Sequence, residues 1–68
     1  SKRTRNHMTK ALESELAHTR TKINEISEAL KQCDSVNREA LEILMDVLQD
    51  SEDDILKELD LLQANSHA

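Results

Sequence analysis

Apolar residues recur along the first half of the chain with spacings that alternate between four and three. They are Leu12, Leu16, Ile23, Ile26, Leu30 and Cys33, and Thr19 occupies the one position where the repeat lacks an apolar side chain. This period of 3.5 residues is typical of a coiled-coil seam, in which positions a and d of each heptad meet a neighbouring helix. The pattern predicts an all-α chain whose seam needs a helical partner.

The stretch from Val36 to Leu48 carries more apolar side chains than one stripe can hold, because eight of its thirteen residues are apolar. Continuing the upstream heptads places Asn37, Ala40, Leu44 and Val47 in the seam, with Val36, Leu41, Ile43 and Leu48 at the flanking positions. Flanking positions of a coiled coil are normally charged, whereas here they are apolar. We therefore expect other helices to cover this segment from several sides. The predicted oligomer interface therefore comprises all the seam residues named so far, together with Leu41 and Leu48.

Asn37 is the one polar side chain of this seam to which the pattern gives a role. An Asn at an a position lowers stability but fixes the register and the number of strands. The alternative is that the seam opens here and the amide is hydrated, because the apolar stripe shifts by one residue close by.

The length of the chain makes self-association the expected route to stability. Below about 70–80 residues, one core rarely contributes more than a few kcal/mol without disulfides, a metal or oligomerisation. The 68 residues include one Cys, and the three His show no metal-ligand spacing, so oligomerisation remains. Leu30 at a beside Ile26 at d favours a parallel trimer over a dimer, although a tetramer fits the same rule.

The first candidate interruption of the helix is at residues 33–35. Asp34 and Ser35 can both cap a helix N-terminus. No Gly or Pro is present to enforce a turn, so we interpret this stretch as continuous helix. A hairpin that turns at residues 33–35, with two arms of similar length, is the alternative.

The second candidate is at residues 50–51, where we predict the break. Ser51 followed by Asp54 approximates a capping box, and carboxylates in a first turn suit the positive end of a helix dipole. The sequence thus predicts an oligomeric coiled coil or helical bundle: a basic disordered lead-in (1–8), a coiled-coil oligomerisation helix (9–50), a short acidic amphipathic helix (51–64) and a frayed tail (65–68).

The short acidic helix has an apolar stripe of its own, formed by Ile55, Leu59 and Leu62. We expect it to fold back so that this stripe covers the apolar surplus between Leu41 and Leu48. One straight helix of about 90–100 Å is the alternative.

Charge is distributed unevenly along the chain. Residues 1–22 contain six Lys or Arg and two Glu, whereas residues 23–68 contain three Lys or Arg and twelve Asp or Glu. Blocks of opposite sign attract each other when a chain folds back on itself.

No constellation of residues predicts catalysis, a cofactor or a metal. The paired carboxylates Asp53/Asp54 and Glu39/Glu42 lie on polar faces of the predicted helices, outside any dry cleft. Cys33 is at a d position, which favours a packed core thiol over a redox thiol. His18 is expected to face water. We therefore expect no enzymatic activity.

The expected function is homo-oligomerisation as a module of a larger intracellular scaffold or assembly protein, for example of the cytoskeleton. The alternatives are a segment that docks in a groove of a different protein, and a basic zipper that binds DNA through Lys2, Arg3, Arg5 and Lys10. One unpaired Cys favours an intracellular, cytoplasmic location, and no apolar run is long enough to suggest a membrane span.

Overall fold

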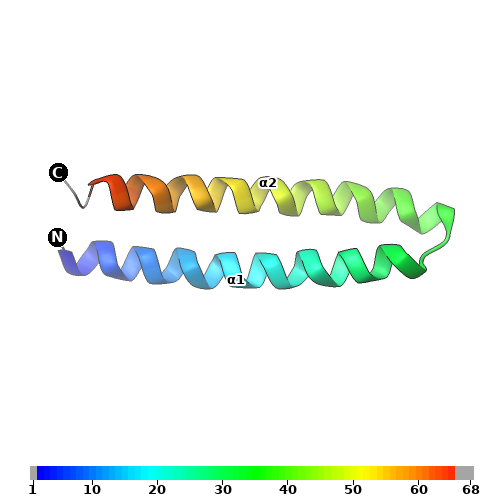
Figure 1. Ribbon diagram of the computed structural model, residues 1–68, viewed down its shortest axis with the longest axis horizontal. Coiled ribbons are helices and arrows are strands. Elements are labelled where there is room, and N and C mark those ends of the chain that lie inside the picture. Colours follow the sequence, from blue (N-terminus) through cyan, green and yellow to red (C-terminus); the bar gives the residue numbers. More distant parts are fainter. Residues whose placement is uncertain (1, 66–68) are drawn as a thin grey trace.

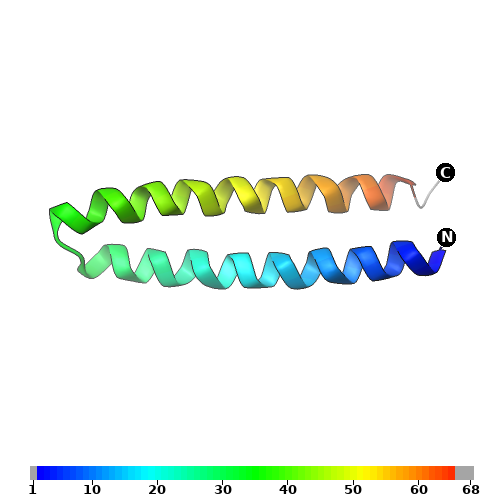
Figure 2. The same cartoon turned by 180° about the vertical axis from the view of Figure 1, so that it is seen from behind.

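The computed structural model describes the backbone of residues 2–65 and the side chains of residues 6–64, and it consists of two antiparallel helices. Helix α1 covers Lys2–Gln32 and helix α2 covers Ser35–Asn65, each 31 residues long. They lie side by side along their whole length, and the beginning of α1 and the end of α2 are at the end of the hairpin opposite the turn (Figures 1 and 2). The resulting hairpin measures 50 × 15 × 12 Å. The expected all-α fold is confirmed.

The turn consists of Cys33 and Asp34, and Asp34 caps α2. Its Oδ1 accepts a hydrogen bond of 2.9 Å from the backbone N–H of Asn37, and its carbonyl oxygen accepts one of 3.0 Å from the N–H of Arg38. This is the geometry of an N-cap residue bonded to the third residue of the first turn. None of the described residues has a positive φ angle, so the reversal is made without any conformation that requires Gly.

The predicted position of the break was wrong. The helix expected over residues 9–50 ends at Gln32, and α2 continues through residues 50–51, where a new helix was predicted. The alternative hairpin, with its turn at residues 33–35, describes the structure. Helix α1 also begins at Lys2, although a disordered lead-in was predicted for residues 1–8. Of the predicted tail, Asn65 belongs to α2 and residues 66–68 lie outside the described part.

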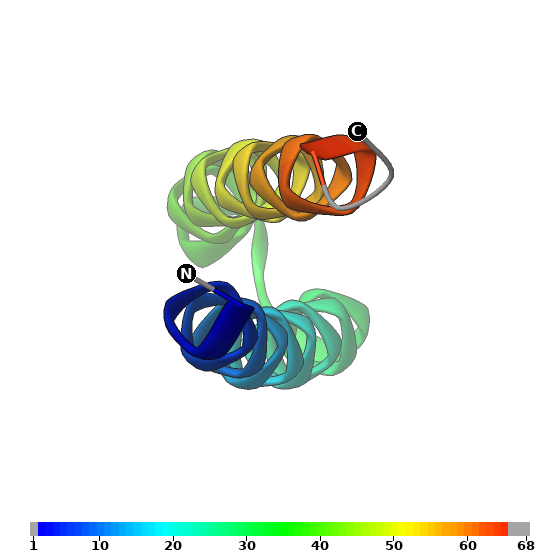
Figure 3. The ribbon, with the colours of Figure 1, turned by 90° about the vertical axis from the view of Figure 1, so that its left-hand side faces the viewer.

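Each helix turns one regular stripe toward the other. The least exposed positions of α1 from residue 12 onward are Leu12, Leu16, Thr19, Ile23, Ile26 and Leu30, and Cys33 of the turn continues their spacing; those of α2 are Leu41, Met45, Leu48, Glu52, Ile55, Leu59 and Leu62. Spacings of four and three hold throughout both stripes, which keeps each facing its neighbour although the helix axes are inclined to each other (Figure 3). The one-residue shift in the apolar pattern therefore marks the change from one helix to the other.

The buried core lies in the half of the hairpin away from the turn. Leu12 and Leu16 of α1 form one cluster with Ile55 and Leu59 of α2, and Leu62 packs against it. The predicted fold-back of Ile55, Leu59 and Leu62 onto residues 41–48 was wrong, because these three residues lie on the same straight helix as residues 41–48 and contact α1 instead.

Candidate interaction surface

The hairpin sorts the predicted interface residues into two groups. The α1 members, together with Leu41 and Leu48 of α2, lie in the stripes through which the two helices of one chain meet. Asn37, Ala40, Leu44 and Val47 are exposed instead, because α2 uses the register of Leu41 and Leu48 for its contact with α1. Whether these four contact another chain stays a prediction.

The exposed residues belong to an apolar surface on the first half of α2, which we call the outer patch. It consists of Val36, Ala40, Ile43, Leu44 and Val47. Val36 is 81% exposed, Ile43 61%, Val47 55% and Leu44 43%. Val36 and Ile43 were absent from the predicted interface. Their apolar side chains at positions flanking the expected seam were the sequence signal for including them.

Helical geometry makes the outer patch continuous. Residues spaced by three and four lie on one face, so Val36, Ala40, Ile43 and Val47 form a stripe about 16 Å long at 1.5 Å per residue. Leu44 lies between this stripe and the side of α2 that contacts α1. In this stretch the apolar surface therefore runs from the contact with α1 around to the outside of the hairpin.

An open groove of about 430 Å³ adjoins the outer patch, between the two helices and next to the turn. Its lining residues are Ala29, Gln32, Cys33, Asn37, Ala40 and Leu41. Most of these side chains are small or apolar. The Cys33 thiol is half-buried and donates a 3.6 Å hydrogen bond to the carbonyl of Leu30.

Burial between the helices is uneven, and the half near the turn has less of it. Leu12, Leu16, Ile55 and Leu59, in the other half, are buried to 9% exposure or less. The apolar residues that line the contact near the turn are only half-buried: Ile23, Ile26, Leu30, Leu41, Met45 and Leu48. The half of the hairpin that bears the outer patch is therefore also the half in which the contact between the two helices is less buried.

A second, smaller groove lies at the open end of the hairpin. It has a volume of about 240 Å³ and is lined by Met8, Leu12, Glu58, Leu61 and Leu62. Leu61 is 64% exposed. It lies on the same face of α2 as Val47, but Asp54 stands between the two and interrupts the apolar surface. It is therefore a less extensive apolar surface than the outer patch.

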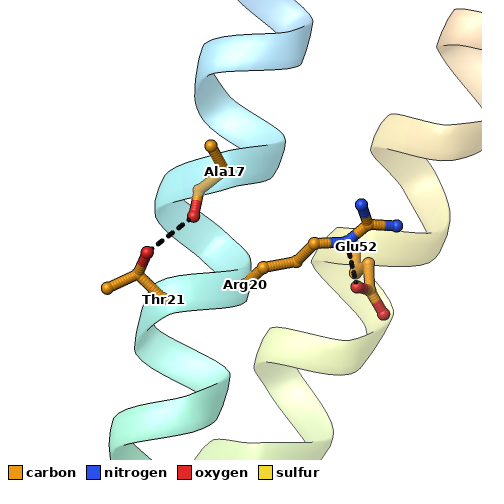
Figure 4. Close-up of polar contacts among 4 residues, drawn as sticks. All are labelled: Ala17, Arg20, Thr21 and Glu52. Atoms are coloured by element: carbon orange, nitrogen blue, oxygen red, sulfur yellow. Dashed lines mark hydrogen bonds and ion pairs between the residues drawn. The ribbon is translucent and has the colours of Figure 1, made fainter.

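An ion pair crosses the middle of the hairpin, and carboxylates border the outer patch. Arg20 Nε donates a hydrogen bond of 2.9 Å to Glu52 Oε2, joining the basic half of α1 to α2 (Figure 4). Nearby, the Thr21 hydroxyl donates to the carbonyl of Ala17 at 2.9 Å within α1. On the outer side of the patch stand the exposed carboxylates of Glu39 and Asp46, which we call the acidic rim.

The described residues provide neither a metal site nor a membrane-spanning helix. No set of three or more His, Cys, Asp and Glu side chains in that part of the chain is placed to hold a metal ion. Neither α1 nor α2, as far as they are described, has a stretch apolar enough to cross a membrane. His18 is exposed, as expected, and the side chains of Lys2, Arg3 and Arg5, proposed to enter DNA, lie outside the described part.

Comparison with known proteins adds no assignment. No protein-family model, curated protein or solved structure matches this chain. The outer patch and its adjoining groove are therefore the features from which a function can be inferred.

Proposed function

We propose that the chain is a self-association module: a helical hairpin that dimerises through the outer patch of α2 and so multiplies the binding sites of a larger intracellular scaffold or assembly protein. The observation that carries this proposal is the exposure of four large aliphatic side chains on one face, beside a contact between the helices that is only half-buried. Contiguous exposed apolar surface on a small domain is typical of protein interaction sites.

The size of the outer patch supports a weak, reversible association. The exposed fractions of its four large side chains add up to about 2.4 side chains. At about 1.5–3 kcal/mol for each fully buried aliphatic side chain, covering the patch on two copies contributes about 7–14 kcal/mol. Association itself costs about 4–15 kcal/mol in lost freedom. The two amounts are similar, so we expect dissociation constants in the micromolar to millimolar range.

Weak pairing suits a module whose purpose is valency. When several weak contacts are linked in one assembly, the second and later contacts form at high effective concentration and the total affinity rises by orders of magnitude. The proposed module therefore needs no tight dimer in isolation.

The hairpin changes the basis for the expected oligomeric state. The expectation of a trimer depends on a seam between residues 12 and 33 that is open to other chains, and in the structure α2 of the same chain covers that seam. Each hairpin then offers one extended patch on one side. A single self-complementary patch is satisfied by a two-fold pair, the commonest symmetry of soluble oligomers, so we propose a dimer.

Sedimentation equilibrium over a wide concentration range tests the proposal. The parent chain should shift from monomer to dimer, and Ile43→Glu should remain monomeric because two uncompensated carboxylates would be buried in the contact. Leu61→Glu is the matched control, since Leu61 lies on the same helix with nearly the same exposure, 64% against 61%, but outside the outer patch. Both variants should keep the helical circular dichroism of the parent.

Three results would contradict the proposal. A parent chain that stays monomeric up to millimolar concentration would favour docking of a helix from a different protein in the groove. Dissociation by Leu61→Glu alone would move the interface to the open end. Assembly that Ile43→Glu leaves intact would remove the outer patch from the interface.

A further inference from the structure

We infer that the outer patch pairs with the outer patch of a second copy in one orientation: α2 against α2, antiparallel, with Val36 facing Val47 of the second copy and Ala40 facing its Ile43. This inference rests on the proposed function and specifies its partner and geometry. The overlap is confined to the halves of the two hairpins near their turns.

The spacing of the stripe supports an antiparallel register. Val36, Ala40, Ile43 and Val47 are separated by four, three and four residues, and this series reads the same in both directions. Two copies related by a two-fold axis through the middle of the stripe therefore bring all four positions into register at once. The two ends of the stripe are both Val, so its outer layers are matched in size as well.

Side-chain size in the middle of the stripe decides between the orientations. In the antiparallel register the small Ala40 faces the large Ile43 of the second copy, twice by symmetry, so the two central layers have equal volume. A parallel register pairs Ala40 with Ala40 and Ile43 with Ile43, which leaves a gap in one layer and crowds the next. Interiors pack best where large residues face small ones across the contact.

The groove near the turn provides a place for Leu44. With the two-fold axis between Ala40 and Ile43, Leu44 of one copy lies opposite the surface between Asn37 and Leu41 of the other. That surface is the α2 wall of the 430 Å³ groove, and Asn37, Ala40 and Leu41 line it. Together with Leu44 of the same helix, these residues have the i, i+3, i+4, i+7 spacing of the holes that receive knobs between packed helices.

Charge at the scale of the whole hairpin favours the same orientation. The basic first half of α1 lies in the open half of the hairpin, because the turn follows Gln32. A parallel dimer would bring the two basic segments to the same end, whereas an antiparallel overlap at the turns places them at opposite ends. Antiparallel helices also oppose their dipoles, although this effect is confined to the terminal turns.

The dimer would be an elongated bar with its two open ends pointing away from each other. Hairpins 50 Å long that overlap by about 25 Å, or about 16 residues at 1.5 Å each, give a length of about 75 Å. Such a bar would hold the segments attached to the two chains far apart, which fits a spacer between binding sites.

Cysteine cross-linking between copies tests the orientation. In a Cys33→Ser background, Val36→Cys and Val47→Cys are prepared as separate chains, one carrying a mass tag, and are mildly oxidised singly and as a mixture. Both positions are exposed in the hairpin, so neither change should disturb its helicity. A disulfide needs Cα atoms within about 7 Å, which the antiparallel register gives only to the 36–47 pair. Like positions would be about 16 Å apart, eleven residues at 1.5 Å each.

The expected result is a disulfide dimer in the mixture that contains one chain of each kind, with little from either chain alone. Disulfides from each chain alone, with none of the mixed species, would establish the parallel orientation and overturn the inference while leaving the proposed function intact. A dimer in sedimentation that forms no disulfide at either position would overturn it too. A parent chain that is monomeric in sedimentation would overturn the proposed function along with the inference.

Discussion

Two isoleucines on α2 provide a direct test of the hairpin, because the same substitution should change stability greatly at one site and little at the other. Ile55 is 5% exposed and belongs to the core cluster, whereas Ile43 is 61% exposed on the outer patch. Replacing a buried Ile by Ala typically costs about 2–5 kcal/mol. A domain of this length has a free energy of unfolding of about 3–10 kcal/mol at 0.05–0.15 kcal/mol per residue. Ile55→Ala should therefore remove a large part of the stability.

Thermal unfolding followed by circular dichroism measures the difference. Near this size, 1 kcal/mol shifts Tm by about 4–8 °C, so Ile55→Ala should lower Tm by at least about 10 °C or abolish the cooperative transition. Ile43→Ala should change the free energy of unfolding by less than about 1 kcal/mol, because Ala is the better helix former and little buried surface is lost. Both should be measured at about 5 µM, where weak association contributes little.

The packing of α2 on α1 has a second, independent signature. Leu12 and Leu59 belong to one buried cluster but to different helices. A double-mutant cycle between Leu12→Ala and Leu59→Ala should therefore show a coupling energy of about 0.5–3 kcal/mol. Equal losses of stability from the two Ile→Ala changes, or additive effects of the two Leu→Ala changes, would refute the hairpin packing.

Three further predictions concern the turn and the charges. Asp34→Ala should lower the free energy of unfolding by about 0.5–2 kcal/mol, measured by urea denaturation, because it removes the cap on the N–H of Asn37, whereas Asp34→Asn should largely retain it. Arg20→Ala should lower the free energy of unfolding by no more than about 1 kcal/mol, because its ion pair with Glu52 is partly exposed, and this loss should shrink in high salt. Glu28→Ala breaks only an exposed pair with Lys31 on the same helix and should have no measurable effect on stability. Dimerisation should instead strengthen with salt in sedimentation experiments, because the acidic rims of two copies approach each other.

Most of the local structure follows from the residues themselves. A chain without Gly, Pro or aromatic residues and with two apolar stripes of period 3.5 has few alternatives to helix, and the structure is helical on both sides of one short turn. The stripe of α1 was identified residue by residue. So was the surplus of apolar side chains between Val36 and Leu48, of which Leu41, Met45 and Leu48 face α1 and the other five form the outer patch.

The position of the turn could not be fixed from local signals. Two sites offered caps of similar quality, Asp34 and Ser51, and a cap contributes only about 1 kcal/mol. The larger number of carboxylates favours a break at residues 50–51, and the absence of Gly at residues 33–35 favours a continuous helix there. The structure makes this turn without any positive φ, so that absence carried no information.

What decided between the two sites was the tertiary contact of whole helices. A turn after Gln32 lets the stripe from Leu12 to Cys33 meet the stripe from Leu41 to Leu62 over their full length, while a turn at residue 50 would have left most of the first stripe uncovered within the chain. The apolar area buried by that long contact outweighs any single cap. The sequence alone therefore determined that the chain is helical and which residues are apolar stripes. Only the pairing of the two stripes, an interaction between distant residues, determined where the chain turns and which apolar side chains stay exposed.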